Sequence, residues 1–526
     1  MSLSPVRLRD GLLQPNRLSG GRIGGGGQSP RDAILATASP ATLAYVQAVE
    51  AADGNIQLEN AVLAAMVTFA NYRIPLGGAC CLMAGARTLA GALVPMVGAA
   101  PDPVNFVTGD YDRVTGLAGD GIGKYLDSNR AGNADAQNNV HIGVFVTTAD
   151  PSGTKLYMGG SSANGGFSLG VTSGFVFTRN QSSAFNISGT TSTATGLLAS
   201  ARSEGASYGT RFGSNTATVS ITSQGPAPAT INVFTQDATP FTFISGARLS
   251  MYSIGPNVDL TAMDTAITTA MDAIDRAINP LRYAILDAFS VATRNYLLAV
   301  EAADGQQLEN TVLAAMGSFA EYRIPLGGAC CLMAGARTLA GALVPMVGAA
   351  PTNFNFVAGD YNRVTGLAGD GIGKYLNSNR NNNADPQDNR HIAVWQSAIA
   401  TTVSAHIVFG TANITGATRF VSFNPGTVSA VVTGTSVNIA TMTTGFLGAS
   451  RSNGSSAAAR NNSTPYSASS ASVLPTSENL GVFGNSYGVA LCSARLSMYS
   501  IGPAVDLTAM DTAITTCMNA LAAAGI

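Results

Sequence analysis

One segment of thirty residues occurs twice in the chain, letter for letter, and this repeat limits the folds that are open to it. The sequence YRIPLGGACCLMAGARTLAGALVPMVGAAP occupies 72–101 and again 322–351. Shorter matches surround it, such as AVEAADG at Ala48 and at Ala299. The repeating unit is therefore about 250 residues long, which indicates tandem domains, because solenoid repeats span only about 20–50 residues.

The repeat divides the 526-residue chain into three predicted parts. A basic, Gly-rich arm covers 1–30, a first domain covers 31–281 and a second domain covers 282–526. A chain of this length is also too long for one ordinary domain.

Each copy is predicted to begin with a helical hairpin and to end with a helix. Apolar residues recur at three- and four-residue steps in the second arm of the hairpin, which is typical of an amphipathic helix. The closing helix is expected to start at a capping box formed by Thr261 and Asp264, repeated by Thr508 and Asp511. The apolar positions of the hairpin are Leu58, Val62, Met66 and Phe69, and in the second copy Leu308, Val312, Met316 and Phe319.

The remainder of each copy is predicted to form strands. From His141 the sequence HIGVFVTT places Ile142, Val144 and Val146 on alternate positions, the period of a half-buried strand. The Gly-Asp-Gly around Asp120 lies between two short segments and predicts a hairpin turn. Several short strands separated by Ser, Gly and Asn indicate a β-sandwich.

Two motifs in each copy resemble those of a known family. TGLAGDGIGKYL and ARLSMYSIG, with the strand patterns between them, resemble concanavalin A-like (laminin-G-like) jelly-roll domains, in particular those of bacteriophage tail and fibre proteins. The resemblance covers roughly 72–274 and 322–520. It implies two tandem antiparallel β-sandwiches with structural or carbohydrate-binding duties, in a mainly β chain with flanking helices. It implies no single activity, because one fold hosts many functions.

Composition and charge exclude several classes of protein. Charged residues make up 11% of the chain and the net charge is −2, so no basic surface is expected to draw in nucleic acid or an anionic membrane. No apolar run has the length of a signal peptide or a membrane span. The six cysteines lack the spacing of a disulfide framework or a zinc site, which indicates buried thiols and folding in a reducing cytoplasm.

Residues for hydrolysis are not apparent in the sequence. Polysaccharide-cleaving enzymes of the concanavalin-like fold need two neighbouring carboxylates, and the seven glutamates form no such motif. The chain also lacks phosphate-binding and nucleophile motifs. We therefore expect no enzymatic activity and no cofactor, with a polysaccharide depolymerase as an alternative.

Four aspartates of the shared motif are the candidates for a metal site: Asp110, Asp120, Asp360 and Asp370. Oxygen-rich loops bind Ca²⁺, which takes six to eight oxygen ligands. Aspartates beside glycines also form tight turns without any metal. We expect a turn-forming role and keep calcium as the alternative.

Histidine and tryptophan give further candidates. His141 and His391 occupy equivalent strand starts and, with His406, are too scattered for a metal cluster, so packing or hydrogen bonding is expected. Trp395 is the one tryptophan and aligns with Phe145 of the first copy. This alignment favours a core position, whereas an exposed ring would serve as a stacking platform for sugar.

The two copies agree at their ends and differ in the middle. Residues 143–245 and 393–492 match only in strand pattern, although the sequences on either side are nearly identical. We hypothesise that the flanks form the core and an assembly face common to both domains. The middles would then face different surroundings. Drift in exposed strands is the alternative.

The N-terminal arm carries four arginines against a single acid, Asp10, and ends in GGRIGGGG. Such a segment is expected to be flexible on its own. We interpret it as an anchoring peptide, with an incidental basic tail as the alternative. The arginines are Arg7, Arg9, Arg17 and Arg22.

The sequence thus predicts a non-enzymatic bacteriophage virion protein, made in the host cytoplasm and located in the tail or a tail fibre. It would act as a spacer or as an adhesin for host-surface glycan. Its partners would be other virion proteins, bound through the arm, and further copies of itself. The alternatives are a capsid decoration or cement protein, a glycan-binding lectin and the depolymerase.

Overall fold

The computed structural model divides into two compact units, Met1–Ile278 and Asn279–Ile526. This division lies close to the end of the sequence repeat at residue 281. The structure describes residues 28–526 apart from 162–163, 237–242, 401–404, 413–414, 424–426 and 440–441.

The first unit is built on two antiparallel sheets, one of eight strands and one of seven. The eight-stranded sheet comprises, in spatial order, β13 (Asn215–Ser220), β12 (Ser207–Phe212), β11 (Gly196–Arg202), β6 (Val140–Thr148), β15 (Arg248–Gly255), β4 (Gly116–Ala118) and β3 (Tyr111–Asp112), with β1 (Ala79–Leu82) also paired to β15. The seven-stranded sheet comprises β10 (Asn186–Thr191), β9 (Phe175–Asn180), β8 (Phe167–Thr172), β7 (Lys155–Gly159), β14 (Thr230–Val233), β5 (Tyr125–Ala131) and β2 (Asp102–Val104).

The second unit repeats this topology strand for strand. Its eight-stranded sheet comprises β28 (Thr464–Ser469), β27 (Ser456–Asn461), β26 (Gly445–Arg451), β21 (Arg390–Ala398), β30 (Arg495–Gly502), β19 (Gly366–Ala368) and β18 (Tyr361–Asn362), with β16 (Ala329–Leu332) on β30. Its seven-stranded sheet comprises β25 (Val437–Ile439), β24 (Thr427–Val432), β23 (Thr418–Phe423), β22 (His406–Gly410), β29 (Asn479–Val482), β20 (Tyr375–Asn381) and β17 (Thr352–Phe354). The predicted fold, two tandem antiparallel sandwiches with flanking helices, is confirmed.

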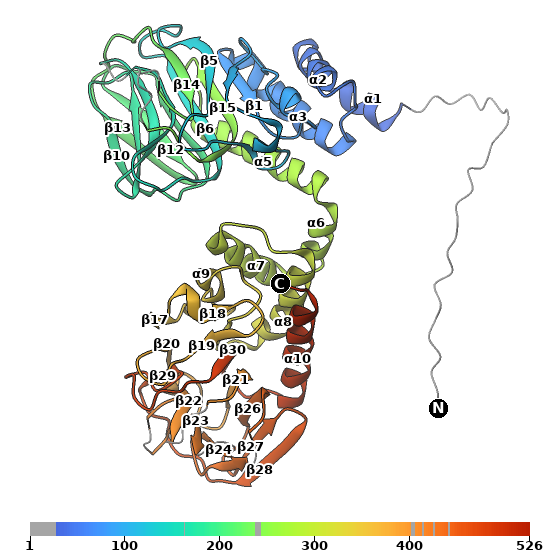
Figure 1. The fold of residues 1–526 in the computed structure, drawn as a ribbon, viewed down its shortest axis with the longest axis vertical. Coiled ribbons are helices and arrows are strands. Elements are labelled where there is room, and N and C mark those ends of the chain that lie inside the picture. The colour runs from blue at the N-terminus through green and yellow to red at the C-terminus, as the bar shows by residue number, and fades with distance from the viewer. Residues whose placement is uncertain are drawn as a thin grey trace, which may run out of the picture. The chain divides into compact units, whose positions relative to one another are not determined.

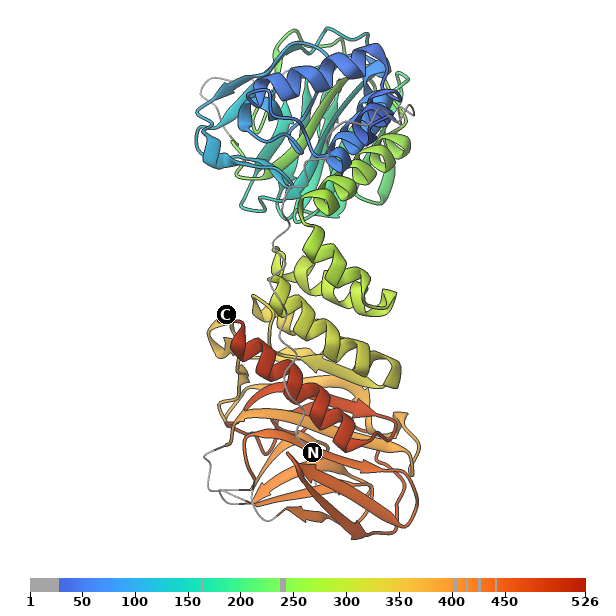
Figure 2. The ribbon, with the colours of Figure 1, turned by 90° about the vertical axis from the view of Figure 1, so that its right-hand side faces the viewer.

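Helices cover one side of each sandwich, as Figure 1 shows for α3 and α5 and Figure 2 for α10. The predicted hairpin corresponds to α2 and α3 and, in the second unit, to α7 and α8; α5 and α10 close the units. None of the helices in the described part of the chain is long and apolar enough to cross a membrane. The helices are α1 (Pro30–Leu35), α2 (Pro40–Ala52), α3 (Asn60–Arg73), α4 (Leu89–Ala92), α5 (Leu260–Ile278), α6 (Pro280–Asp287), α7 (Val291–Asp304), α8 (Asn310–Arg323), α9 (Leu339–Ala342) and α10 (Leu507–Ala523).

Each unit therefore has three layers and two apolar cores. One core lies between the sheets and includes Ile142, Val144 and Val146, while the other lies between the eight-stranded sheet and the helices and includes Phe145. Strand β6 is consequently buried on both faces. The predicted half-buried strand is wrong, because the helices cover the face that would otherwise be solvated.

The segment that is identical in both units contributes to both cores. Cys80 and Leu82 of β1 pack on the helix side, and Cys81 packs between the sheets. Gly78 precedes β1 with φ +87°, and a Cβ there would lie 2.1 Å from the Ile254 carbonyl oxygen of β15. Because this segment packs into both cores, substitutions that change the size of its side chains are expected to destabilise the unit. All six cysteines of the chain are buried and none forms a disulfide.

Asp120 lies in a turn that connects the two sheets. Strand β4 before it pairs with β3 and β15 of the eight-stranded sheet, whereas β5 after it pairs with β2 and β14 of the other. The predicted hairpin is therefore wrong. Glycine and aspartate do form a turn here, but the sequences of short strands do not indicate which sheet each strand joins.

Candidate functional site

Trp395 lies on the outer face of β21 in the second unit, where the first unit has a phenylalanine. Trp395 pairs with Phe446 of β26 and Met498 of β30. Its ring packs against the apolar core beneath the helices but is only half-buried. The residue at this position in the first unit, Phe145, is buried. The larger indole is therefore partly accessible at the edge of the helix layer.

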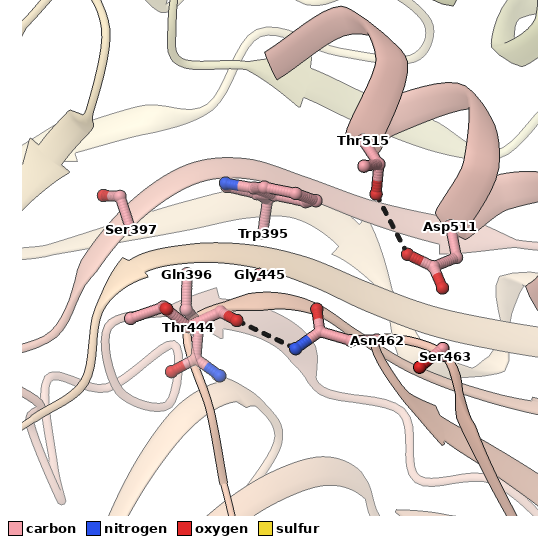
Figure 3. A pocket seen from close by; sticks show the side chains of 9 residues that line it. All are labelled: Trp395, Gln396, Ser397, Thr444, Gly445, Asn462, Ser463, Asp511 and Thr515. Atoms are coloured by element: carbon pink, nitrogen blue, oxygen red, sulfur yellow. Dashed lines mark hydrogen bonds between the residues drawn. The ribbon is translucent and has the colours of Figure 1, made fainter. Parts of the chain in front are cut away.

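Trp395 lines a pocket of about 500 Å³ between α10 and the ends of three strands. Figure 3 shows the Trp395 ring and the Asp511 carboxylate on the same side of β21, and the Gln396 amide on the other side. This arrangement follows from the alternation of side chains along a strand. The lining residues are Trp395, Gln396, Ser397, Thr444, Gly445, Asn462, Ser463, Asp511 and Thr515.

The carboxylate of the pocket is held by two contacts. Asp511 Oδ2 accepts from Arg460 Nε at 2.8 Å, and Oδ1 accepts from Thr515 Oγ1 at 3.1 Å, one turn further along α10. The two charged side chains are largely buried, so their positions are fixed by the fold. The pocket thus offers a carboxylate of defined orientation beside an aromatic ring.

Asn462 forms the rim of the pocket at the turn between β27 and β28. Its Oδ1 accepts from Phe446 N at 2.8 Å, and its Nδ2 donates to Thr444 O at 2.9 Å (Figure 3). Gly445 lies against it with φ +115°, and a Cβ there would be 2.0 Å from Asn462 Oδ1. The first unit has Gly213 at the turn position of Asn462. The Asn462 side-chain amide therefore fixes the rim of the pocket in the second unit.

The sequence identified only part of this site. Trp395 was expected in the core, and the structure places it at the border of the core and the pocket. The sequence pattern assigns Asp511 to a helix cap and does not single out Asn462. The contrast between Asn462 and Gly213, in otherwise similar turns, was the available signal.

The predicted capping boxes are wrong. The cap of α10 is Asp506, whose Oδ1 accepts from Thr508 N at 2.8 Å and Ala509 N at 3.3 Å. Asp259 caps α5 in the same way, accepting from Thr261 N at 2.8 Å. Asp264 accepts instead from Arg211 of β12, as Asp511 does from Arg460. Asp259 and Asp506, which precede the helices, accept from the free N–H groups of the first turn. Asp264 and Asp511 are therefore available for contacts with the sheet.

Asp120, one of the candidate calcium ligands, stabilises the turn by hydrogen bonding. Its Oδ1 accepts from the backbone N–H groups of Ile122, Gly123 and Lys124 at 2.8–3.0 Å. Asp370 makes the same three contacts in the second unit, at 2.9–3.0 Å. A carboxylate oxygen surrounded by three N–H donors is arranged for hydrogen bonding, as expected of a turn-forming aspartate.

Asp110 and Asp360 are each paired with a lysine. Lys124 Nζ lies 2.6 Å from Asp110 Oδ1, and the equivalent contact joins Lys374 and Asp360 at 2.6 Å. Burial acts to raise the pKa of Asp110, but the Lys124 ammonium and the Val107 N–H outweigh it and hold the pKa below its ordinary value. Within the described residues there is no group of three or more His, Cys, Asp or Glu side chains that could hold a metal ion.

His141 and His391 are buried hydrogen-bonding residues. His141 Nδ1 lies 2.6 Å from the Pro256 carbonyl oxygen, so this nitrogen carries the proton, and Nε2 lies 2.7 Å from Ser253 Oγ. Ser253 Oγ in turn accepts a hydrogen bond from Nε of the buried Arg73 at 2.8 Å. Burial, reinforced by the Arg73 guanidinium, lowers the pKa of His141 from 6.5 to about 3. His391 makes the equivalent contacts, and burial lowers its pKa to about 3 as well.

The arm arginines lie outside the described residues, which begin at Gln28. This applies to Arg7, Arg9, Arg17 and Arg22. Ser29 and Pro30, assigned to the arm from the sequence, belong to the start of α1: Ser29 caps the helix by accepting from Asp32 N, and Pro30 is its first residue.

No protein-family model and no curated protein sequence matches the chain. Among solved structures it is similar to domains LG4-5 of the mouse laminin alpha1 chain, with 9% identity over 71% of this chain and 85% of that one and a TM-score of 0.20. It is also similar to the enzymatically active domain of bacteriophage CBA120 tailspike protein 2, with 13% identity over 34% of this chain and 30% of that one and a TM-score of 0.23.

A third similar structure is Trypanosoma rangeli sialidase, with 7% identity over 67% of this chain and 61% of that one and a TM-score of 0.27. The chain spans less than two thirds of the sialidase and tailspike chains. The expectation that the chain is not an enzyme is corrected by these matches, because enzymes are among the structures that it resembles. At these identities the likeness concerns the fold alone.

Proposed function

We propose that the chain is a structural protein of a bacteriophage virion, in the tail or a tail fibre, and that its second unit binds a host-surface glycan. The ligand would occupy the pocket beside Trp395. The N-terminal arm would attach the chain to other virion proteins, and the first unit would act as a spacer.

The observation that carries the proposal is the half-buried Trp395 ring beside fixed polar groups. A sugar ring presents C–H groups on its faces and hydroxyl groups around its rim. It is therefore bound by a flat apolar surface together with oriented hydrogen-bonding groups. Ligand sites generally combine apolar lining with a few placed polar side chains.

The polar part of the pocket is arranged before a ligand arrives. Arg460 and Thr515 hold Asp511, and backbone contacts hold Asn462. Side chains that are already ordered lose little conformational freedom when a ligand binds. Such preorganisation is favourable for recognising hydroxyl groups.

The first unit has the same scaffold without the tryptophan. It keeps the ion pair, with Arg211 Nη2 at 2.6 Å from Asp264 Oδ2. Four lining positions differ, where the first unit has Phe145, Val146, Thr147 and Gly213. A site in the second unit and a spacer role for the first are consistent with this difference.

The virion assignment is supported by the sequence. Its motifs resemble those of phage tail and fibre proteins, its surface carries little charge, and its basic arm suits attachment to a neighbouring subunit. Electron microscopy of particles would distinguish a tail position from a capsid decoration.

Glycan arrays and binding titrations with the full chain test the proposal. Trp395→Phe introduces the first unit's residue, whose ring is buried at Phe145. It is expected to weaken glycan binding about tenfold, because the accessible aromatic surface, worth about 1 kcal/mol, is lost. Tyr487→Ala is the matched control, because Tyr487 is an aromatic residue of the same unit that is 67% exposed outside the pocket.

Equal loss in both variants, or none in Trp395→Phe, would contradict the assignment of the pocket. The same protein samples are incubated with host polysaccharide, and the concentration of reducing sugar ends is measured. An increase with wild-type protein would show that the bound glycan is cleaved.

A further inference from the structure

The seven-stranded sheet of the first unit ends in β10, an edge strand that faces solvent. Among the described strands, β10 pairs with β9 alone. Its outward backbone groups are therefore open to another strand. Such an edge is a template for pairing with a further chain.

An apolar patch follows this edge on the outer face of the sheet. Phe175 and Phe177 of β9 alternate with Val176, which lies in the core between the sheets. Ile187 of β10 is the cross-strand partner of Phe177, and the ring of Phe185 lies 5.3 Å from that of Phe177. Phe175 is 42%, Phe185 58% and Ile187 51% exposed. The Phe177 ring beneath them is buried, with 4% exposure. We call the three exposed residues, Phe175, Phe185 and Ile187, the edge patch.

The second unit has polar residues at the equivalent positions. Strand β24 has Thr427 and Ser429 on either side of the buried Val428, and Asn438 of β25 is the cross-strand partner of Ser429. The fold is thus formed without an apolar patch at this place. Large exposed apolar groups that the fold does not require mark a contact surface.

The edge carries none of the charges that usually protect such strands. From Asn180 to Ala201 the sequence contains no Asp, Glu, Lys, Arg, His or Pro. Natural edge strands are commonly guarded by Lys, Pro or a bulge. The irregular register between β10 and β9 lies between Ile187, the partner of Phe177, and Thr191, the partner of Phe175.

We infer that the edge patch is an interface between two copies of this chain, with their β10 strands antiparallel across a two-fold axis. In that arrangement the edge patch of one copy lies beside the same patch of the other, and the open backbone groups pair. An uncharged edge suits its own copy, because no like charges are brought together. A charged partner would find no complementary group here.

The small size of the edge patch determines the strength of the contact. Stable interfaces bury about 1,200–2,000 Å² in total, and an exposed aromatic side chain contributes at most about 150–250 Å². We therefore expect a reversible dimer whose population increases with protein concentration.

Sedimentation of the full chain over a range of concentrations tests this inference. Wild type is expected to form the dimer, and the double variant Phe175→Thr/Ile187→Asn, which introduces the second unit's residues, is expected to shift the dissociation constant upward at least about tenfold. The matched control is Ile122→Thr, because Ile122 is an aliphatic residue of the same unit with 82% exposure. It should dimerise like wild type.

Cross-linking provides an independent readout if the double variant folds poorly. Because all six native cysteines are buried, Ile187→Cys provides an accessible thiol. A short bis-maleimide should then yield a covalent dimer, whereas Ile122→Cys should not.

Monomeric wild type at every concentration, an unchanged constant in the double variant, or cross-linking through position 122 instead of 187 would overturn the inference. Glycan binding at Trp395 is measured separately, so failure of either idea leaves the other standing.

Discussion

The buried histidines make the folded chain sensitive to acid. His141 has a folded pKa of about 3 against 6.5 in its ordinary state, so the unfolded chain takes up a proton between these values and the folded chain does not. The stabilisation is complete above pH 6.5 and is lost progressively as the pH falls toward 3. His141 is the only histidine of the first unit, which makes it suitable for a test.

Between pH 7.0 and 5.5 we expect His141 to cost the protein about 1 kcal/mol of unfolding free energy. Urea titrations followed by circular dichroism at both pH values measure this loss. In His141→Asn the protein should be less stable at pH 7.0, but the loss on acidification should be smaller by about 1 kcal/mol. An equal loss in both proteins would contradict the lowered pKa.

Gln396 is a second residue whose surroundings predict a measurable effect. Its side chain is fully buried, and neither amide atom has a hydrogen-bond partner. The first unit has Val146 at this position, in the core between the sheets. Gln396→Val should raise the free energy of unfolding by about 1–3 kcal/mol, because a buried polar group without a partner is costly. Val146→Gln is the matched reverse change, and stabilisation by both would contradict this explanation.

Residue-level prediction from sequence succeeded where the neighbours in the chain decide the role. Asp120 was expected to form a turn because the groups it binds are two to four residues away. Asp511 was missed because its partner, Arg460, lies 51 residues earlier. Trp395 could be singled out, but its partial exposure depends on α10, whose position over the strands the sequence does not indicate.

At the scale of elements, the helix starts show how local chemistry and tertiary contacts compete. Asp506 and Thr508 are both suitable caps for α10, and the structure uses Asp506 while Thr508 Oγ1 accepts from Arg460. Asp506→Ala should lower the free energy of unfolding by about 1 kcal/mol, as for other N-cap substitutions. Thr508→Ala should cost less. Thermal or urea denaturation of both variants measures the two losses of unfolding free energy. A larger loss in Thr508→Ala would support the predicted capping box instead.

Periodicity predicted the strands and helices themselves but not how they assemble. The alternation in β6 was correct, yet both of its faces are buried because α5 packs over the outer one. The segments on either side of Asp120 were recognised as short strands, yet they join different sheets. Layering and sheet membership depend on residues far apart in the sequence, which a single sequence pattern does not contain.

At the scale of the whole molecule, the two units share a scaffold and differ in what it presents. The strand orders match, whereas the edge patch occurs in the first unit and the Trp395 ring in the second. This distribution is consistent with middles that meet different surroundings. The hypothesis that the flanks form the core is wrong, because the middles also supply core residues between the sheets, such as Leu169 and Val176 in the first unit and Phe420 and Val428 in the second.

Deletion of residues 2–27 tests the anchoring role of the arm. The cut stops before Ser29, which caps α1, and leaves the Arg31–Glu50 ion pair of 2.6 Å intact. We expect both units to fold, with wild-type circular dichroism and melting, while incorporation into particles is lost. Normal incorporation of the shortened chain would show that the arm is not the anchor.

Intrinsic fluorescence tests the central claim most directly, because Trp395 is the only tryptophan in the chain and reports on its own pocket. The full chain is titrated with host-surface polysaccharide while tryptophan emission is recorded. We predict a saturable change in emission at the concentrations where binding is measured independently, as the ring leaves water for the face of a sugar. Binding of the polysaccharide with unchanged Trp395 emission would contradict the account.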